Sequence, residues 1–177
     1  DAIVSEEKVA IYGDYDVDGV TSSALITNFL RYLGVKAEVF VPDRFRDGYG
    51  LNANRVEELV RGGANVLITV DCGTSNLKEI EIAHNLGCDV IVVDHHTVPS
   101  EPARPLALLN PARSDCGFPF PKLAAVGVAF FLCISIRREL RQRNHFSDGL
   151  AEPDLRALLP LVALGTVADV MPLVDIN

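Results

Sequence analysis

The sequence contains no tryptophan, one methionine and four cysteines, none of them in a CxxC pair. These cysteines lie far apart in a mixed strand and helix pattern, which predicts neither a disulfide framework nor a structural zinc knuckle. A reducing cytoplasm fits this cysteine usage, and no signal or transit peptide is visible. The four positions are Cys72, Cys88, Cys116 and Cys133.

Long apolar runs are also lacking. The nearest candidate, residues 124–136, is interrupted by Gly127 and passes into Arg137 and Arg138, so it predicts a core helix with a basic end rather than a membrane span. We therefore expect a soluble protein that makes no membrane contact. Because the chain starts with Asp1 rather than Met and stops directly after an apolar stretch, we expect both ends to be cut from a longer polypeptide.

Positive charge is scarce. Sixteen Lys and Arg residues stand against 24 Asp and Glu residues, which gives a formal net charge of −8. This balance argues against non-specific nucleic-acid binding through the whole surface, so a polyanionic substrate must be held locally by metals and particular basic residues. With 177 residues, 49% of them hydrophobic, the chain can bury a sizeable core and is expected to form one domain, residues 1–177.

Short β-branched runs alternate with helical patterns in the first half of the sequence. Such continuously hydrophobic runs are typical of strands buried on both faces of a parallel sheet. The fold class predicted is therefore α/β, an open, mainly parallel sheet flanked by helices, with a helical C-terminal part that follows a proline-rich loop region at 97–122. The expected strands are 8–12, 36–41, 66–70, 89–93 and 106–109, and the expected helices are 19–33, 54–61, 76–86, 123–143 and 153–164, the last two joined by a polar linker at 144–152.

Potential metal ligands follow three of these strands. Because the carboxyl ends of parallel strands meet at one edge of a sheet, three separate segments are expected to converge there. So many carboxylates in one place would have raised pKa values, or would unfold the site, unless cations neutralise them. The sequence thus predicts a metal centre built from Asp14, Asp16, Asp18, Asp71, Asp94, His95 and His96.

Each motif has a plainer interpretation when it is taken alone. Asp18 alone favours a helix cap, and Asp71 is balanced between a cap and a ligand, but three aspartates at alternate positions repel one another and favour metal. Two adjacent histidines leaving a strand point different ways, so one can bind metal while the other faces substrate. Asp169 alone would be a helix C-terminal or turn residue.

Groups that could hold phosphate flank these motifs. Thr21 and Ser22 offer hydroxyl and N–H groups at the predicted helix start, where a phosphate oxygen could bind. Arg44 and Arg46, with Tyr49, lie in a loop that is either a solvated turn or a place where arginine binds phosphate and tyrosine stacks on a base.

The motifs DYDVDG, VDCG, VDHH and GTVADVMPL, in that order, resemble those of the DHH phosphoesterase superfamily. The stretches PDRFRDGYGLN, NPARSDCGFPFPKLAAVGVAF and LVALGTVADVMPL are similar to its RecJ branch, the single-strand-specific 5′-to-3′ DNA exonucleases. Together they cover nearly all of the chain from Val9 to Leu173.

The resemblance implies a role for each matched residue. Asp71 would bridge two cations, Mn²⁺ or Mg²⁺, and His96 would contact the scissile phosphate. Which of the three aspartates of the first motif bind directly stays open, because related pyrophosphatases begin that motif with a histidine where Tyr12 stands here. The implied metal ligands are Asp14, Asp16, Asp18, Asp71, His95 and Asp169, and the implied catalytic set is Asp16, Asp18, Asp71, His95 and His96.

The resemblance also implies the wider activity. It predicts a two-metal phosphodiesterase that releases 5′ mononucleotides from single-stranded DNA in repair and recombination, as a cytoplasmic monomer that works with single-strand-binding protein and a helicase. The family's DHHA1-type and oligonucleotide-binding domains are expected to lie outside this chain. Two alternatives stay open: another DHH hydrolase, acting on oligoribonucleotides, cyclic dinucleotides or pyrophosphate, and an inactive replication scaffold, which is disfavoured because every acidic and histidine position is intact.

Overall fold

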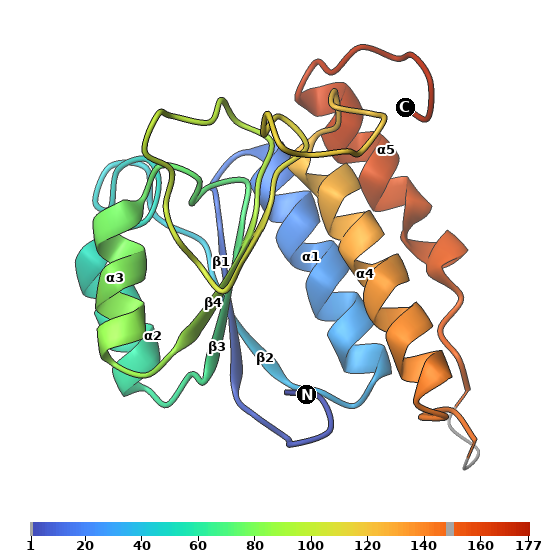
Figure 1. The fold of residues 1–177 in the computed structure, drawn as a ribbon, viewed down its shortest axis with the longest axis horizontal. Helices are drawn as coiled ribbons and strands as arrows, with labels where there is room; N and C mark the ends of the chain where they lie inside the picture. Colours follow the sequence, from blue (N-terminus) through green and yellow to red (C-terminus); the bar gives the residue numbers. More distant parts are fainter. Residues whose placement is uncertain (1, 148–150) are drawn as a thin grey trace.

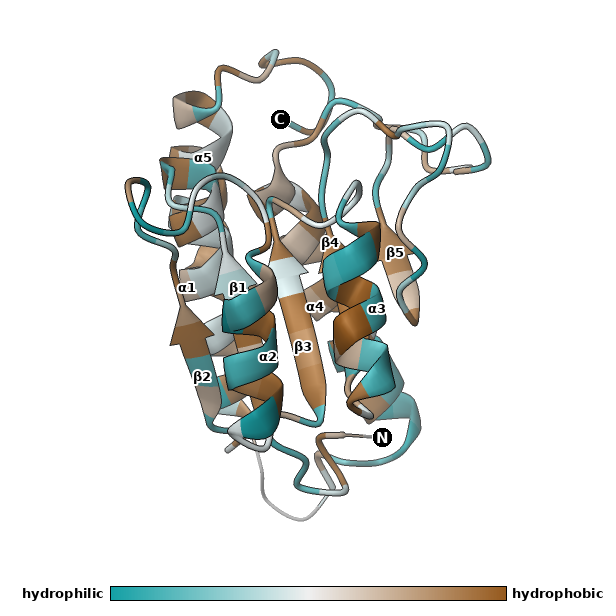
Figure 2. Cartoon of the chain, turned by 90° about the vertical axis from the view of Figure 1, so that its left-hand side faces the viewer, coloured by the Kyte–Doolittle hydropathy of each residue, from teal (hydrophilic) through white to brown (hydrophobic). Residues whose placement is uncertain are grey.

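A five-stranded, fully parallel sheet forms the centre of the computed structural model, which describes residues 2–147 and 151–177. The strand order is β2-β1-β3-β4-β5, and Figure 2 shows the strands in this order. This confirms the predicted fold class. The strands are β1 (Val9–Gly13), β2 (Ala37–Phe40), β3 (Val66–Val70), β4 (Asp89–Val93) and β5 (Ala107–Leu109).

Helices cover both faces of the sheet, as Figure 1 shows. One face carries α1 (Val17–Tyr32), α4 (Ala125–Gln142) and α5 (Leu159–Ala168), the last preceded by a 3-10 turn, η1 (Leu155–Leu158). The opposite face carries α2 (Ala53–Arg61) and α3 (Leu77–Asn85). Within the described part of the chain, no helix combines the length and the apolar character that a membrane span requires.

Alternate residues of the central strands feed two separate cores, because side chains along a strand point to opposite faces. In β1, Val9 and Ile11 pack with the core under α1 and α4, whereas Ala10 and Tyr12 pack with the core under α2 and α3. All five residues of β1 are buried. This burial on both faces explains why these strands are short, continuous apolar runs.

The hydrogen-bond ladder continues one residue beyond three strands, and an aspartate occupies each of these positions. Asp14 donates its backbone N–H to Val70 O at 3.2 Å, and Asp71 donates to Val93 O at 2.9 Å. Asp94 likewise donates to Leu109 O at 2.9 Å. The three aspartates therefore stand in register at the carboxyl edge, beside the β1–β3 junction where the strand order reverses, which is the usual position of ligand sites in open parallel sheets.

All five helices lie where they were predicted but differ at their ends, by one or two residues in the first four; the last begins at Leu159 rather than residue 153, because residues 155–158 form η1. The first begins at Val17 rather than residue 19, because Asp16 already caps it. The last continues to Ala168 rather than ending at residue 164, since Gly165 and Thr166 are buried within it. The predicted linker at 144–152 lies partly outside the described residues.

Candidate metal centre

The acidic and histidine motifs of the sequence converge at the carboxyl edge of the sheet. Asp14 follows β1, Asp71 follows β3, and Asp94, His95 and His96 follow β4. Asp169, the residue at the C-terminal cap of α5, reaches the same place from the helical layer.

The first motif turns sharply from β1 into α1. The Asp16 carboxylate accepts a hydrogen bond from Gly19 N at 3.0 Å and so caps α1, as aspartate commonly does. Gly19 is required because a Cβ there would lie 2.4 Å from Asp14 O. This tight turn leaves Asp16 exposed while Asp14 and Asp18 are buried.

Asp71 lies in the middle of the centre. Its backbone has a φ of 63°, in the left-handed region that few residues other than glycine adopt, although aspartate tolerates it better than most. The residue is 1% exposed, and its Oδ1 atom has no hydrogen-bond partner among the described residues. A buried carboxylate oxygen without a partner is costly, so this atom is suited to bind a cation.

His95 faces three carboxylates at once. Its Nε2 atom lies 3.3 Å from Asp71 Oδ1, 3.6 Å from Asp169 Oδ2 and 3.7 Å from Asp18 Oδ2. In the described part of the chain this buried nitrogen also has no hydrogen-bond partner. An imidazole nitrogen and carboxylate oxygens that converge without bonding one another are arranged as ligands around a cation.

The electrostatics of the cluster support the same interpretation. Burial, followed by the charges of Asp18 and Asp16, raises the pKa of Asp71 from 3.8 to about 10. Burial also raises the pKa values of Asp14 and Asp18. Because the carboxylates oppose one another's ionisation, a divalent cation would relieve both the repulsion and the desolvation.

The potential ligands form two groups, with a third group between them. Within each group the ligand atoms lie within 4.8 Å of one another. The ligands are mainly oxygen with one or two imidazoles, a set that suits Mn²⁺ or Mg²⁺ rather than a metal that prefers thiolates. The groups are Asp14, Asp16 and Asp71; Asp18, His95 and Asp169; and, between them, Asp71, His95 and His96.

Asp94, which the sequence offers as a further ligand, instead organises the segment that follows it. Its Oδ1 atom accepts hydrogen bonds from His95 N at 2.8 Å, His96 N at 3.2 Å and His96 Nδ1 at 2.8 Å. Burial acts to raise the pKa of Asp94, but hydrogen bonds from His96 and Thr74 outweigh it and hold the pKa below its usual value. The hydrogen bond to Asp94 in turn raises the pKa of His96.

The loop at 42–50 lies beside the cluster. The Tyr49 hydroxyl lies 3.1 Å from His96 Nε2, on the ring edge opposite Asp94. The Arg44 guanidinium lies over the ring of Tyr15, 5.7 Å from its centroid, and so stands next to the first motif. Arg46 is exposed on the same loop.

The hydroxyl groups of Thr21 and Ser22 do not reach the surface of the site. Thr21 is 4% exposed and its hydroxyl donates to Val17 O at 2.7 Å, within its own helix. Ser22 is 0% exposed. Their predicted contact with phosphate therefore stays a prediction, without support from this arrangement.

Two buried polar residues that the sequence did not single out, Thr74 and Asn110, lie behind the histidines. They are 1% and 3% exposed, and Asn110 Nδ2 donates to Thr74 Oγ1 at 3.0 Å. Thr74 follows Asp71 closely in the sequence, and this position next to a candidate ligand could have identified it as part of the site. Asn110 offered none beyond its place at the end of β5.

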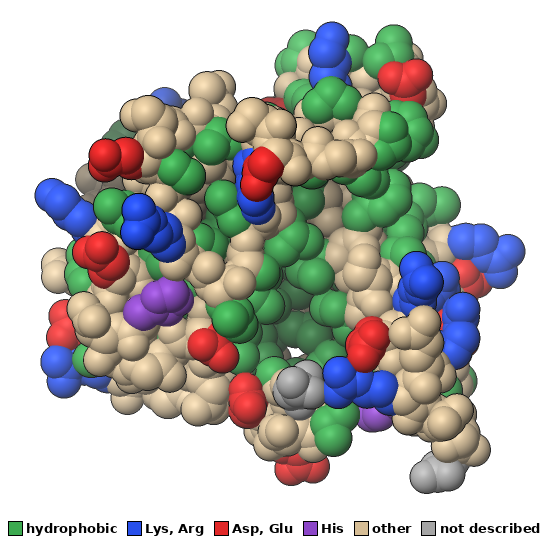
Figure 3. Space-filling model, in the orientation of Figure 1, with side chains coloured by type: hydrophobic (Ala, Val, Ile, Leu, Met, Phe, Trp, Pro, Cys, Tyr) green, Lys and Arg blue, Asp and Glu red, His purple; other side chains and the backbone are tan. Residues whose placement is uncertain are grey.

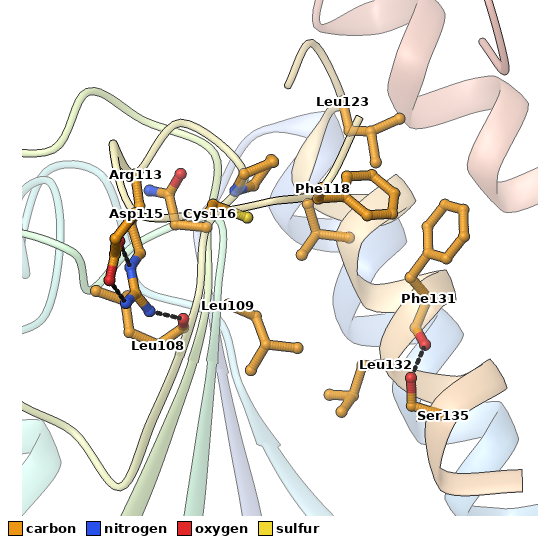
Figure 4. Close-up of a pocket in the computed structure, with 13 residues that line it drawn as sticks. Leu108, Leu109, Arg113, Asp115, Cys116, Phe118, Leu123, Phe131, Leu132 and Ser135 are labelled. Carbon is orange, nitrogen blue, oxygen red and sulfur yellow. Dashed lines mark hydrogen bonds and ion pairs between the residues drawn. The ribbon is translucent and has the colours of Figure 1, made fainter. Parts of the chain in front are cut away.

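An apolar cavity of about 430 Å³ lies apart from this cluster, between β5 and α4. Figure 3 shows hydrophobic side chains lining a hollow on this side of the molecule, and Figure 4 shows Leu109 and Leu132 facing each other across it. Its one acidic side chain, Asp115, is paired with Arg113 at 2.6 Å. It contains none of the candidate ligands.

Comparison with known proteins gives consistent matches. Residues 8–166 match the family described as "DHH family, N-terminal domain". The single-stranded-DNA-specific exonuclease RecJ of Dickeya dadantii (strain 3937) is 47% identical over 176 residues, which are 97% of this chain and 30% of that protein. The enzyme of the same name from Escherichia coli (strain K12) is 45% identical over 168 residues, 94% of this chain and 29% of that protein.

A solved structure also resembles this fold closely. A crystal structure of exonuclease RecJ bound to manganese superposes with a TM-score of 0.82 and 34% identity, covering 97% of this chain and 41% of that one. The chain thus spans about 30% of the length of these two curated relatives.

Proposed function

Since the chain belongs to the DHH family, of which it matches the N-terminal domain, we propose that it is the catalytic domain of a two-metal phosphodiesterase. The proposed reaction is the release of 5′ mononucleotides from single-stranded DNA in the 5′-to-3′ direction, in DNA repair and recombination. The proposal draws on relatives described as single-stranded-DNA-specific exonucleases, 47% and 45% identical to this chain.

The residues proposed to hold the two ions are those whose ligand atoms converge at the carboxyl edge. Asp71 belongs to the group with Asp14 and Asp16, its Oδ1 atom lies 3.3 Å from His95 Nε2 of the other group, and it is proposed to bridge the two. Mn²⁺ or Mg²⁺ bound here would activate a water, neutralise phosphate charge and stabilise the leaving oxygen. The full proposed ligand set is Asp14, Asp16, Asp18, Asp71, His95 and Asp169.

His96 is proposed to contact the scissile phosphate. Its Nδ1 atom is engaged by Asp94, so its Nε2 atom is the one turned toward the loop at 42–50. The raised pKa of His96 favours the protonated ring, which donates a hydrogen bond from Nε2 to a phosphate oxygen. Asp16, Asp18, Asp71, His95 and His96 are the proposed catalytic set.

Arg44 and Arg46 are proposed to bind the backbone phosphates of the strand, because guanidinium groups match phosphate geometry. Tyr49, which is 63% exposed, offers a face on which a base can stack. With a net charge of −8, the domain has few other cations for a long contact with DNA. We therefore propose that the family's DHHA1-type and oligonucleotide-binding domains supply much of the affinity in a longer protein.

The cellular setting implied by the resemblance is part of the same proposal. The protein would act in the cytoplasm, as a monomer, on strands exposed by a helicase and coated by single-strand-binding protein.

One observation carries the proposal. Asp71 Oδ1 and His95 Nε2 are buried 3.3 Å apart, neither has a hydrogen-bond partner in the described residues, and Asp18 and Asp169 approach the same nitrogen. Hydrogen bonding alone would leave both atoms unsatisfied, whereas a shared cation satisfies them together.

A substrate panel tests the proposal. The 177-residue chain and a longer protein that contains it would be offered 5′-labelled single-stranded DNA, duplex DNA, RNA and pyrophosphate, each with Mn²⁺ or Mg²⁺. We expect mononucleotide release from single-stranded DNA alone, slower in the short chain through weaker binding, and none with Asp71→Asn. Preferential hydrolysis of RNA or pyrophosphate would indicate another DHH hydrolase, and inactivity of the longer protein on every substrate would indicate a scaffold.

A further inference from the structure

Asn110 uses its side-chain amide to connect three segments behind the candidate metal centre. It directly follows β5 and is 3% exposed. Its Nδ2 atom donates to His96 O at 2.9 Å and to Thr74 Oγ1 at 3.0 Å, while its Oδ1 atom accepts from Ala112 N at 2.8 Å. The three groups that it contacts are held in place, because two belong to the backbone and the third, the Thr74 hydroxyl, is on a buried side chain.

The orientation of this amide is determined by its neighbours. If the amide were flipped, its oxygen would face His96 O and its NH₂ group would face the N–H of Ala112, so an acceptor would meet an acceptor and a donor a donor. Such mismatched buried groups are costly. The NH₂ group of Asn110 is therefore held toward His96 and Thr74.

Thr74 passes this constraint on to Asp94. The backbone N–H of Thr74 donates to Asp94 Oδ2 at 3.0 Å, and Thr74 helps to hold the pKa of Asp94 below its usual value. Because Asn110 donates to the Thr74 hydroxyl oxygen, it holds the Thr74 side chain and with it the segment whose backbone N–H binds Asp94. Asp94 Oδ1 then accepts from His96 Nδ1 at 2.8 Å.

Asn110 thus holds His96 at both ends, directly at its backbone carbonyl and through Thr74 and Asp94 at its ring. Asn110, Thr74 and Asp94 are each at most 3% exposed, whereas the His96 side chain is 45% exposed and its Nε2 atom lies beside Tyr49. Without these hydrogen bonds, the ring of an exposed side chain would be mobile and would not keep a single orientation.

We infer that Asn110 is a positioning residue for the reaction: through His96 O and the Thr74–Asp94 hydrogen bond, it fixes the direction of the His96 imidazole and keeps a proton on Nδ1, in the protonated ring and in the neutral one. This inference rests on the proposed function for its kinetic consequence. Its structural consequence, the state of the His96 ring, can be measured without any turnover.

The kinetic test uses the 177-residue chain with saturating Mn²⁺ and 5′-labelled single-stranded DNA. Asn110→Asp keeps the size of the side chain and the acceptor for Ala112 N but removes both donors. We expect kcat to fall about 10- to 100-fold with KM and Mn²⁺ affinity nearly unchanged, as for outer partners of catalytic groups. Thr74→Val, which removes only the hydroxyl, should lower kcat in the same way, and the double variant should be no slower than the worse single one.

Ile80→Val serves as the matched control for stability. Ile80 is 1% exposed in the core under α2 and α3, and it takes no part in the hydrogen bonds that link Asn110 to His96. This variant should lower the melting temperature while leaving kcat unchanged. If its kcat falls as far as that of Asn110→Asp at a similar loss of melting temperature, the effect of Asn110 is general destabilisation and the inference is wrong.

Nitrogen NMR of the histidine rings gives the second readout, in the metal-free and the Mg²⁺-loaded chain at a pH where the rings are neutral. The unaltered chain should show His96 protonated at Nδ1, and Asn110→Asp and Thr74→Val should each give a mixture of tautomers. An unchanged Nδ1–H tautomer in both variants would overturn the inference. If the unaltered chain hydrolyses no substrate but the tautomers change as expected, the proposed function fails while the positioning role stands.

Discussion

The carboxylate of Asp18 accepts a hydrogen bond from the backbone N–H of Ala125, 2.6 Å away, although 107 residues separate them in the chain. Its other oxygen accepts from Val126 N at 2.9 Å. These two N–H groups are among the unpaired donors of the first turn of α4, so Asp18 caps a distant helix while it also faces His95. One side chain therefore joins the helical layer to the candidate metal centre.

This double role predicts different effects for two replacements of Asp18. Asp18→Ala leaves the buried N–H groups of Ala125 and Val126 without acceptors and should lower the free energy of unfolding by about 1–3 kcal/mol. Asp18→Asn keeps one acceptor oxygen and removes a buried charge, so it should cost less in metal-free protein. Both should weaken Mn²⁺ binding. Urea unfolding and calorimetry measure the two effects, and equal loss of stability in both variants would exclude the capping role.

Removal of metal should make stability depend on pH. The pKa of Asp71 in the folded protein, about 10, lies above its ordinary value of 3.8, so the folded state binds the extra proton between these values. The metal-free protein should therefore lose stability as pH rises through this window. A cation needs the deprotonated carboxylate, so Mg²⁺ affinity should rise by up to about tenfold per pH unit for each proton displaced. Thermal unfolding at pH 6 and pH 8.5, with and without Mg²⁺, measures both trends; Asp71→Asn should weaken them.

The two histidines should separate metal binding from turnover. His95→Ala removes the nitrogen that three carboxylates surround and should reduce Mn²⁺ affinity by more than about tenfold. His96→Ala removes a ring held by Asp94 and should leave Mn²⁺ affinity nearly intact while kcat falls. Calorimetry and kinetics on both variants provide the comparison. Similar losses of metal affinity would show that both rings are ligands.

Gly165 is predicted to set the distance between α5 and the first motif. A Cβ at this position would lie 2.5 Å from Thr21 Oγ1, 2.7 Å from Val126 Cγ1 and 3.1 Å from Asp18 Oδ1. Gly165→Ala should therefore push α5 outward with Asp169, costing about 1–3 kcal/mol of stability and weakening Mn²⁺ binding.

Trimming a neighbour provides the check on this steric argument. Adding Val126→Ala should recover part of both losses in calorimetry and thermal unfolding. Gly117→Ala is the matched control, since a Cβ there meets nothing within 4 Å, and it should change neither quantity. No recovery in the double variant would contradict the argument.

The strands and most helices could be predicted from sequence because their signals are local. The apolar runs at 66–70 and 89–93 became β3 and β4 with those limits, and Gly34 and Gly87 stand just beyond the ends of α1 and α3. The end of α5 could not be predicted, because Gly165 looks like a helix terminator in sequence. Only its packing against Thr21 shows why a glycine is needed inside this helix.

The sequence could predict the convergence of those site residues that follow a strand, because the ends of parallel strands meet at one edge of the sheet. This rule brings together Asp14, Asp71 and His95, but it says nothing of Asp169, which arrives from a helix in another layer. Asn110 was missed because its role depends on β5 lying beside β4. Thr21 and Ser22 were expected to offer groups to a phosphate oxygen, yet both side chains are buried.

The most direct test of a metal centre at this edge of the sheet is an anomalous difference map from crystals of the chain soaked in Mn²⁺, recorded at the manganese absorption edge. We predict two peaks, one among Asp18, His95 and Asp169 and one among Asp14, Asp16 and Asp71, with Asp71 between them. The absence of any peak within this cluster, or peaks only at exposed acidic residues elsewhere, would contradict the account.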